Sequence, residues 1–294
     1  MLSVPCAIGI DIGGTKSAVA LYETGSWKLI KREKFPTHAQ RGFPAVLEDT
    51  LRLSEEWMTD GVVAIGLGIP GLVKQPEGVI QTLPNIPGGE GYKLLDMCSE
   101  RFDLPVTVEN DSNCFALAEA RKGAGKGDDV VIGITMGTGV GGGIVIDGKI
   151  FRGSQGFAAE IGHMLLVPGS PPFETNNKRG EVEQFLSGSA LRKRCPEAAD
   201  PNEFLEGTSC ASIHPAIIRE CAWLCTNLTH LLNPSSIIFG GSMGKALQAF
   251  LPSIEEEMRQ WVLTGTPLPR LALSQIAGAS TMGAAMLAWD ASQK

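Results

Sequence analysis

Two glycine-rich stretches, "AIGIDIGGTKSAVALYE" at residues 7–23 and "DVVIGITMGTGVGGGIVIDGKIF" at residues 129–151, decide the fold of this chain. Each pattern predicts two apolar strands joined by a glycine turn. Because the two hairpins resemble each other and each opens one half of a 294-residue chain, they predict a duplicated fold with two related halves. Helical patterns follow each hairpin, so the fold class is α/β.

The remaining elements follow from the same periodicities. Further strands are expected at "VVAIGLGIPG" (62–71) and "SSIIFGGS" (235–242), and helices at 43–59, 92–102, 181–194, 217–232 and 281–289. We expect a smaller N-terminal α/β domain formed by residues 1–115 plus 281–294, and a larger C-terminal α/β domain formed by 116–280. No low-complexity linker separates the halves, so the sequence predicts a cleft between domains rather than a flexible tether.

Composition and charge exclude several classes of function. The net charge is −7, and the longest basic run is "RKR" at 192–194, so neither nucleic acid nor an anionic membrane is an expected partner. No apolar run is long enough to span a bilayer, and the N-terminus lacks the basic region of a signal peptide. The seven cysteines form no CxxC pair, which predicts buried, reduced thiols in a cytoplasmic protein.

Three glycine loops follow predicted strands: "DIGGTK" (11–16), "MGTGVGGG" (136–143) and "FGGS" (239–242). Backbone amides in such turns can bind phosphate oxygens, and two adjacent glycines allow positive φ and close approach. A plain hairpin turn is the alternative for each loop alone. Neither a Walker loop nor a dinucleotide fingerprint is present. Asp11 would repel a phosphate, so it fits such a site only with a divalent cation between them.

The stretch "VTVENDSNCFALAEA" (106–120) places polar side chains where a strand turns into a helix. Asp111 or Ser112 could simply cap that helix. Alternatively, the carboxylate of Asp111 could act in catalysis as a general base. This stretch alone leaves both interpretations open.

Over nearly its whole length the chain resembles the ROK family of sugar kinases, within the actin, hexokinase and Hsp70-like superfamily. The resemblance rests on "GIDIGGTK", "GIPG", "ENDSNCFALAEA", "GTGVGGGIV", "GFAAEIGH", "EVEQFLSG" and "LNPSSIIFGG". It implies two ribonuclease H-like or actin-like domains with an interdomain cleft that binds ATP and Mg²⁺, the ion being approached by Asp11 through water. The ATP and phosphate residues it implies are Asp11, Gly13, Gly14, Thr15, Lys16, Gly137, Thr138, Gly139, Gly240 and Gly241.

The resemblance also assigns the chemistry. It implies Asp111 as the catalytic base, with a sugar bound by Gly71, Asn85, Asn110, Asp111, Glu160, His163 and Glu183. Carboxylates and a neutral imidazole suit this task because they accept hydrogen bonds from hydroxyls. Simpler alternatives are a core histidine for His163 and a turn residue for Asn85, and Glu181 competes with Glu183 by spacing.

The chain departs from the family between His163 and Glu183. Many members carry a CxCGxxGCxE element there that binds structural zinc, and the zinc holds one imidazole nitrogen. This chain has no cysteine between Cys114 and Cys195, so we expect no structural zinc. Another group must then orient His163. Glu174, Asn176 and Glu181 fall near the cysteine positions, and the sequence does not choose among them.

The predicted function is an ATP-dependent kinase that phosphorylates the 6-hydroxyl of a hexose, with glucose favoured. The alternatives are an N-acetylglucosamine or N-acetylmannosamine kinase and a fructokinase. A sugar-responsive regulator is a distant alternative, because its DNA-binding domain would precede residue 11 and the basic footprint is missing. A polyphosphate donor would need a longer basic track. A homodimer is expected from the family alone.

Overall fold

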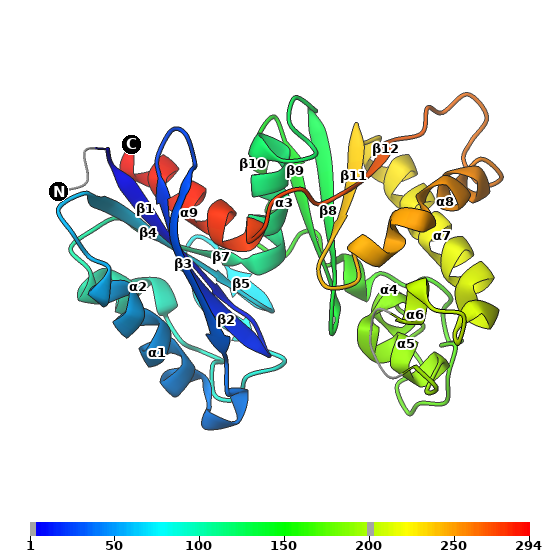
Figure 1. Ribbon diagram of the computed structural model, residues 1–294, viewed down its shortest axis with the longest axis horizontal. Helices are drawn as coiled ribbons and strands as arrows, with labels where there is room; N and C mark the ends of the chain where they lie inside the picture. The colour runs from blue at the N-terminus through cyan, green and yellow to red at the C-terminus, as the bar shows by residue number, and fades with distance from the viewer. Residues whose placement is uncertain (1–3, 199–202) are drawn as a thin grey trace. The chain divides into compact units, whose positions relative to one another are not determined.

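The structure, a computed structural model, describes residues 4–198 and 203–294 (Figure 1). Its strands are β1 (Cys6–Ile12), β2 (Lys16–Glu23), β3 (Leu29–Pro36), β4 (Val62–Ile69), β5 (Leu72–Lys74), β6 (Val79–Thr82), β7 (Val106–Asn110), β8 (Val130–Met136), β9 (Val140–Ile146), β10 (Lys149–Ile150), β11 (Ser236–Gly240) and β12 (Arg270–Leu273). Its α-helices are α1 (Phe43–Glu56), α2 (Leu94–Arg101), α3 (Asp111–Lys122), α4 (Val182–Leu186), α5 (Gly188–Arg194), α6 (Glu203–Glu206), α7 (His214–Leu232), α8 (Leu251–Met258) and α9 (Ala279–Ser292).

The chain forms two compact units. The first comprises Met1–Ala118, Phe151–Ala158 and Ile276–Lys294, and the second comprises Glu119–Ile150 and Ala159–Gln275. From the sequence, residues 151–158 were expected in the second domain. In the structure this segment packs within the first unit, where Arg152 pairs with Glu109 and Gln75 N donates to Gln155 O at 3.0 Å.

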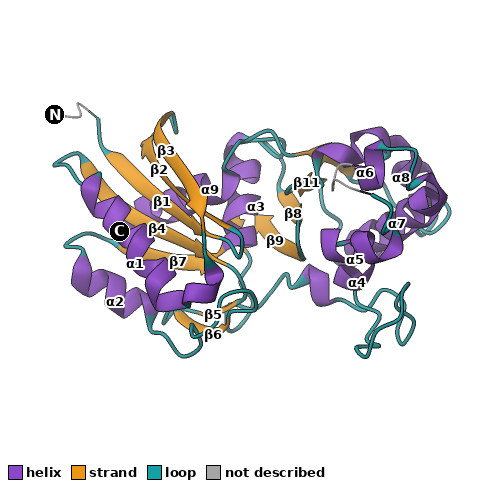
Figure 2. Ribbon diagram, turned by 60° about the horizontal axis from the view of Figure 1, so that its bottom comes forward, coloured by secondary structure: helices purple, strands orange, loops and turns teal. Residues whose placement is uncertain are grey.

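The first unit is built on a five-stranded sheet of order β3-β2-β1-β4-β7. The side chains of β1 alternate between its two faces: Ile8 and Ile10 belong to one core cluster with residues of α1 and α2, whereas Ala7 belongs to another with α9. Figure 2 shows these helices beside the sheet. Because α9 is apolar on nearly all sides, it is typical of a buried helix and not of a surface helix.

The second unit repeats this plan with a sheet of order β10-β9-β8-β11-β12. In both sheets the first strand pairs antiparallel with the second and parallel with the fourth, as β1 does with β2 and β4, and β8 with β9 and β11. The predicted duplication of an α/β fold is therefore confirmed. Helix α7 buries its apolar side in the large core of this unit, together with residues of α4, α5 and α8.

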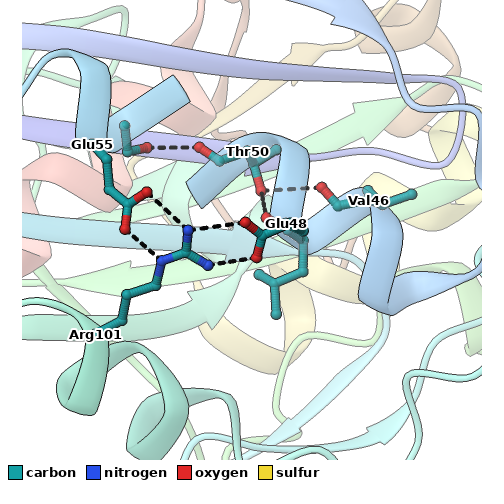
Figure 3. A network of polar contacts seen from close by, with 7 residues as sticks. Val46, Glu48, Thr50, Glu55 and Arg101 are labelled. Carbon is teal, nitrogen blue, oxygen red and sulfur yellow. Dashed lines mark hydrogen bonds and ion pairs between the residues drawn. The ribbon is translucent and has the colours of Figure 1, made fainter. Parts of the chain in front are cut away.

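An ion-pair network joins α1 to α2 in the first unit (Figure 3). The Arg101 guanidinium donates to both carboxylate oxygens of Glu48 at 2.6 and 3.0 Å, and to both of Glu55 at 2.6 and 2.8 Å. Such bidentate pairs fix the angle between donors and acceptors as well as their distance. The network therefore sets how α2 lies against α1 near the surface.

The cysteine prediction is wrong for one pair. Cys195 and Cys210 form a disulfide, while the other five cysteines are free and buried. The partners are 15 residues apart in sequence and lie after α5 and before α7, so no local motif marks them. Neither the 19-residue helix α7 nor any other helix within 4–198 and 203–294 combines the length and apolar character that a bilayer crossing needs.

Candidate active site

The carboxyl ends of three neighbouring parallel strands meet at one edge of the first sheet. The register pairs Asp11 of β1 with Gly68 of β4, and Ile69 of β4 with Asn110 of β7. Asp111 follows at once as the first residue of α3. Open α/β sheets bind ligands at this kind of edge. Two predicted site residues distant in sequence, Asp11 and Asp111, are thus brought to the same place within one unit.

Asn110 caps helix α3. Its Oδ1 accepts from the backbone N–H of Ser112 at 2.9 Å and of Asn113 at 3.1 Å, while its Nδ2 donates to Gly71 O at 3.0 Å. Asp111 Oδ1 accepts from Ser112 N at 2.7 Å, and Oδ2 takes no part in these bonds. The main cap of α3 is therefore Asn110, and not Asp111 or Ser112, which the sequence suggested.

Glu109 supports this corner from the buried side. Its Oε1 accepts from Asn110 N at 2.9 Å and from Asn113 Nδ2 at 3.0 Å, and its Oε2 pairs with Arg152 Nε at 2.6 Å. The Glu109 side chain is 2% exposed, so the ion pair and two hydrogen bonds offset the cost of burying its charge. These contacts make Glu109 a structural support of the turn between β7 and α3.

The carboxyls of Asp11, the predicted Mg²⁺ neighbour, and Asp111, the predicted base, both have raised pKa values. Burial raises the pKa of Asp11 to about 7, and the charge of Asp111 adds to this effect while Lys34 opposes it. Burial also raises the pKa of Asp111, against hydrogen bonds from Ser112 that lower it. Closely placed carboxylates of this kind resist holding two negative charges, which favours a cation or a proton between them.

The loop between β1 and β2 is a tight hairpin. Gly13 N donates to Lys16 O at 3.1 Å, and Thr37 Oγ1 donates to Gly13 O at 2.6 Å. The prediction that positive φ explains its glycines is wrong, because neither Gly13 nor Gly14 adopts it. Space is the reason instead: a Cβ on Gly14 would lie 2.7 Å from Asn85 Cβ. Asn85 therefore covers this loop, and Thr15 and Lys16 are exposed beside it.

Gly71 is a site glycine that does need its backbone freedom. Its φ is +83°, and a Cβ there would meet Thr82 O at 2.2 Å. Because its carbonyl accepts from Asn110 Nδ2, the turn after β4 is tied to the start of α3. The structure thus brings Gly71 and Asn110 into direct contact and places Asn85 against Gly14.

The second unit carries the other two glycine loops at one sheet edge, since β8 and β11 are parallel neighbours. Gly241, with φ of +84°, follows β11, and Met243 N donates to Met136 O at 3.0 Å. The loop 137–139 is supported by the start of α5, where Gly188 N donates to Gly137 O at 2.8 Å and Ser189 Oγ to Thr138 O at 2.8 Å. The two loops therefore lie together.

Glu160, His163 and Glu183 gather next to that loop. Glu160 and His163 belong to a turn, Glu160 before and His163 within the 3-10 helix Ile161–His163. This turn packs on β9 so closely that a Cβ on Gly162 would lie 2.1 Å from Val140 O. Glu183 Oε2 accepts from Val140 N at 2.9 Å, which leaves Oε1 outside this bond.

Between His163 and Glu183, where many family members carry zinc ligands, two side chains of this chain are in direct contact. His163 Nδ1 lies 3.1 Å from Glu181 Oε2, and Arg179 Nε lies 3.3 Å from the same oxygen. Of the three candidates for orienting the ring, Glu181 is the one in contact with it. Within 4–198 and 203–294, no group of three or more His, Cys, Asp or Glu side chains is arranged to hold a metal ion.

Two supporting residues were not predicted from the sequence. Thr37, which bonds to Gly13, and Arg152, which pairs with Glu109, both come from segments far from the residues they support. No local motif marks either one, because each acts only once the chain has folded. Glu181, by contrast, could be identified as a candidate from the sequence, because its spacing competed with that of Glu183.

The repeated sheet order and the three glycine loops define a duplicated protein of the actin-like fold class. The family model described as "ROK family" matches residues 7–291, and the chain belongs to the ROK family.

Individual relatives agree with this assignment. The chain is 31% identical to the glucokinase of Streptomyces coelicolor over 96% of each protein, and 30% identical to the N-acetyl-D-glucosamine kinase of Erwinia tasmaniensis over 95% of this chain and 98% of that protein. Among solved structures, a ROK hexokinase from Thermus thermophilus matches with a TM-score of 0.81 and 29% identity, over 97% of this chain and 98% of that chain. A ROK glucokinase from Streptomyces griseus, in complex with glucose and AMPPNP, matches with a TM-score of 0.79 and 30% identity, over 97% and 99% of the two chains.

Proposed function

We propose that this protein is an ATP-dependent sugar kinase that transfers the γ-phosphoryl group of ATP to the 6-hydroxyl of a hexose. The observation that carries the proposal is the placement of Asp111: a carboxyl with a raised pKa at the head of α3, at the same strand edge as Asp11. Glucose is the favoured substrate, because glucokinases are prominent among the similar proteins.

In this proposal Asp111 accepts the proton of the 6-hydroxyl as that oxygen attacks the γ-phosphorus and the bond to the β-phosphate oxygen breaks, releasing ADP. A positioned base contributes about 10²–10⁴-fold to such a rate. Because Ser112 and Asn110 hold the start of α3, the carboxylate is oriented before the sugar arrives. Most of the remaining acceleration in phosphoryl transfer comes from positioning and charge stabilisation.

We assign the stabilisation of the phosphate charge to the glycine loops and, through Mg²⁺, to Asp11. The amides of Gly14, Thr15, Thr138 and Gly139 suit phosphate oxygens, because Gly13 N and Gly137 N already donate within their own loops. Lys16 is exposed beside the first loop. Mg²⁺ that accompanies ATP would neutralise phosphate charge. The half-buried Asp11 carboxyl, with its pKa raised to about 7 next to Asp111, fits an approach to that ion through water.

We assign the sugar hydroxyls to both donor and acceptor groups of the site. Glu183 keeps Oε1 outside its loop bond, and Asn110 keeps one amide hydrogen after its bond to Gly71. Glu160 and His163 lie on the turn beside Glu183's loop. In the first unit, Gly71 and Asn85 are the further residues that we propose for contact with the sugar. We further propose a homodimer, for which light scattering after gel filtration is the direct measurement.

The test is ADP release with Mg·ATP across glucose, fructose, mannose, N-acetylglucosamine and N-acetylmannosamine. We expect turnover on at least one hexose, with glucose first. The 6-deoxy analogue of the best sugar should bind and inhibit without releasing ADP above the background, because it lacks the accepting oxygen. Absence of turnover on every hexose would contradict the proposal, and sugar binding without ADP release would favour the regulator.

A further inference from the structure

The second unit holds a buried carboxylate directly against the imidazole of His163. We propose that Glu181 is a positioning residue: it fixes His163 as the Nδ1–H tautomer, so that Nε2 accepts a hydrogen bond from a sugar hydroxyl, and it does so without a metal ion. The identity of the ligand as a sugar rests on the proposed function. The state of the ring does not, because it belongs to the ligand-free protein.

The tautomer follows from the donors and acceptors present. His163 Nδ1 lies 3.1 Å from Glu181 Oε2, and an ionised carboxylate can only accept, so Nδ1 must carry the hydrogen. In a neutral imidazole Nε2 is then the acceptor. The Glu181 side chain is 7% exposed and that of His163 is 51% exposed. The pair therefore has a fixed end inside the protein and an accessible end outside it.

Glu181 is held by its own surroundings before any ligand binds. It is the N-cap of α4 in a capping box, accepting from the backbone of Gln184, whose side chain returns to the Glu181 backbone. Gln184 also accepts from Gly180 N at 2.7 Å and donates to Asn177 O at 2.7 Å. These bonds close the loop that precedes α4, so the carboxylate cannot easily turn away from the ring.

Arg179 completes the arrangement. Its Nε lies 3.3 Å from the Glu181 oxygen that faces His163, so part of the carboxylate charge is balanced by a guanidinium. Arg179 itself is 58% exposed and thus remains solvated. The other two residues near the expected cysteine positions, Glu174 and Asn176, are exposed, and no described contact joins either of them to the ring.

The decisive variant is Glu181→Gln. The carboxylate serves both the ring and the helix amide, whereas a glutamine has only one oxygen acceptor for the two. If the glutamine oxygen keeps the bond to the helix amide, the glutamine NH₂ group faces His163 Nδ1. The imidazole would then present a lone pair on Nδ1 and carry its hydrogen on Nε2. Glu174→Gln is the matched control, because it makes the same change on an exposed side chain of the same loop.

The first measurement is the long-range ¹H–¹⁵N correlation pattern of the four histidines in the ligand-free protein, with His163 assigned by its loss in His163→Gln. We expect the Nδ1–H pattern in the wild type and in Glu174→Gln, and a shift toward the Nε2–H pattern in Glu181→Gln. An Nε2–H pattern in the wild type would overturn the proposal even if Glu181→Gln failed to fold.

The second measurement is binding and turnover. Glu181→Gln should weaken sugar binding by about tenfold, the size of one lost hydrogen bond, with an unchanged KM for ATP and a nearly unchanged kcat. A Glu181→Gln protein that matches Glu174→Gln in both tautomer and sugar affinity would overturn the proposal, as would stoichiometric zinc in the purified wild type. If no hexose is phosphorylated but the tautomer shifts as expected, only the proposed function fails.

Discussion

Asp11 and Asp111 lie about 100 residues apart in the sequence, yet the charge of Asp111 affects the protonation of Asp11. The charge of Asp111 is one cause of the raised pKa of Asp11, after burial. Single carboxylates at strand ends are common and carry little information. Asp11 and Asp111 lie at the same sheet edge, next to a glycine hairpin. Together they give this edge a negative charge, which explains why a divalent cation suits it.

The first prediction concerns Asp11 and pH. Its pKa is about 7 in the folded protein and near 3.8 in a solvated chain, so the unfolded state loses its proton first as pH rises. The free energy of unfolding of the ligand-free protein should therefore fall between about pH 4 and about pH 7. Asp11→Asn should flatten this slope in denaturant titrations, whereas the exposed control Asp103→Asn should not. Equal slopes in all three proteins would contradict the assignment.

At the scale of elements, the junction of β7 and α3 depends on a segment from elsewhere in the chain. Arg152 reaches Glu109 from residues 151–158, and Glu109 in turn holds Asn110 and Asn113. The strand-to-helix turn is visible in the sequence, but its support is not. A buried carboxylate needs a cation, and no local pattern says which segment supplies it.

The second prediction tests that support. Arg152→Ala leaves Glu109 buried with one oxygen unpaired, and since Arg152 is 39% exposed, water should compensate in part. We expect a loss of about 1–2 kcal/mol in the free energy of unfolding, measured by urea denaturation, together with a lower kcat. Arg192→Ala, on an exposed position of α5, is the control and should change neither quantity. A stable, fully active Arg152→Ala would show that Glu109 does not position this turn.

Helices and strands with a long, regular apolar pattern could be predicted from the sequence. The breaks within them could not. The sequence predicts one helix over 181–194, whereas the structure has α4 and α5 separated at Ser187. Ser187 Oγ caps α5 by accepting from Ala190 N at 3.0 Å, and the amide of Gly188 is used by the loop at Gly137. The four-residue strand β12 was missed because so short an edge strand shows no clear alternation.

At the scale of the whole molecule, the duplication was predictable because each half opens with its own hairpin of apolar strands around glycines. Both sheets then adopt the same strand order. For the site, the residue types and their grouping within each unit followed from the motifs. The groups that fix those side chains, such as Arg152 and the choice of Glu181, required coordinates because they depend on contacts between distant or competing residues.

The third prediction concerns the disulfide between Cys195 and Cys210. The expectation of a cytoplasmic protein rested in part on reduced cysteines, and this pair does not support it. Unfolding without a reductant should expose five reactive thiols, and seven should react after reduction. Because the bridge closes a loop of 15 residues, Cys195→Ser should lower the free energy of unfolding by up to about 3 kcal/mol. Cys98→Ser would show whether loss of a buried thiol alone has this effect. Seven reactive thiols without reductant would exclude the bridge.

The most direct measurement is kcat for Asp111→Asn with the best hexose and Mg·ATP. Asparagine keeps an oxygen that can accept from Ser112 N, so folding and sugar affinity should stay close to those of the wild type. The lost basicity should lower kcat by at least about 10²-fold. Turnover within about tenfold of the wild type, in a folded variant, would show that the proton goes elsewhere and that Asp111 is not the base.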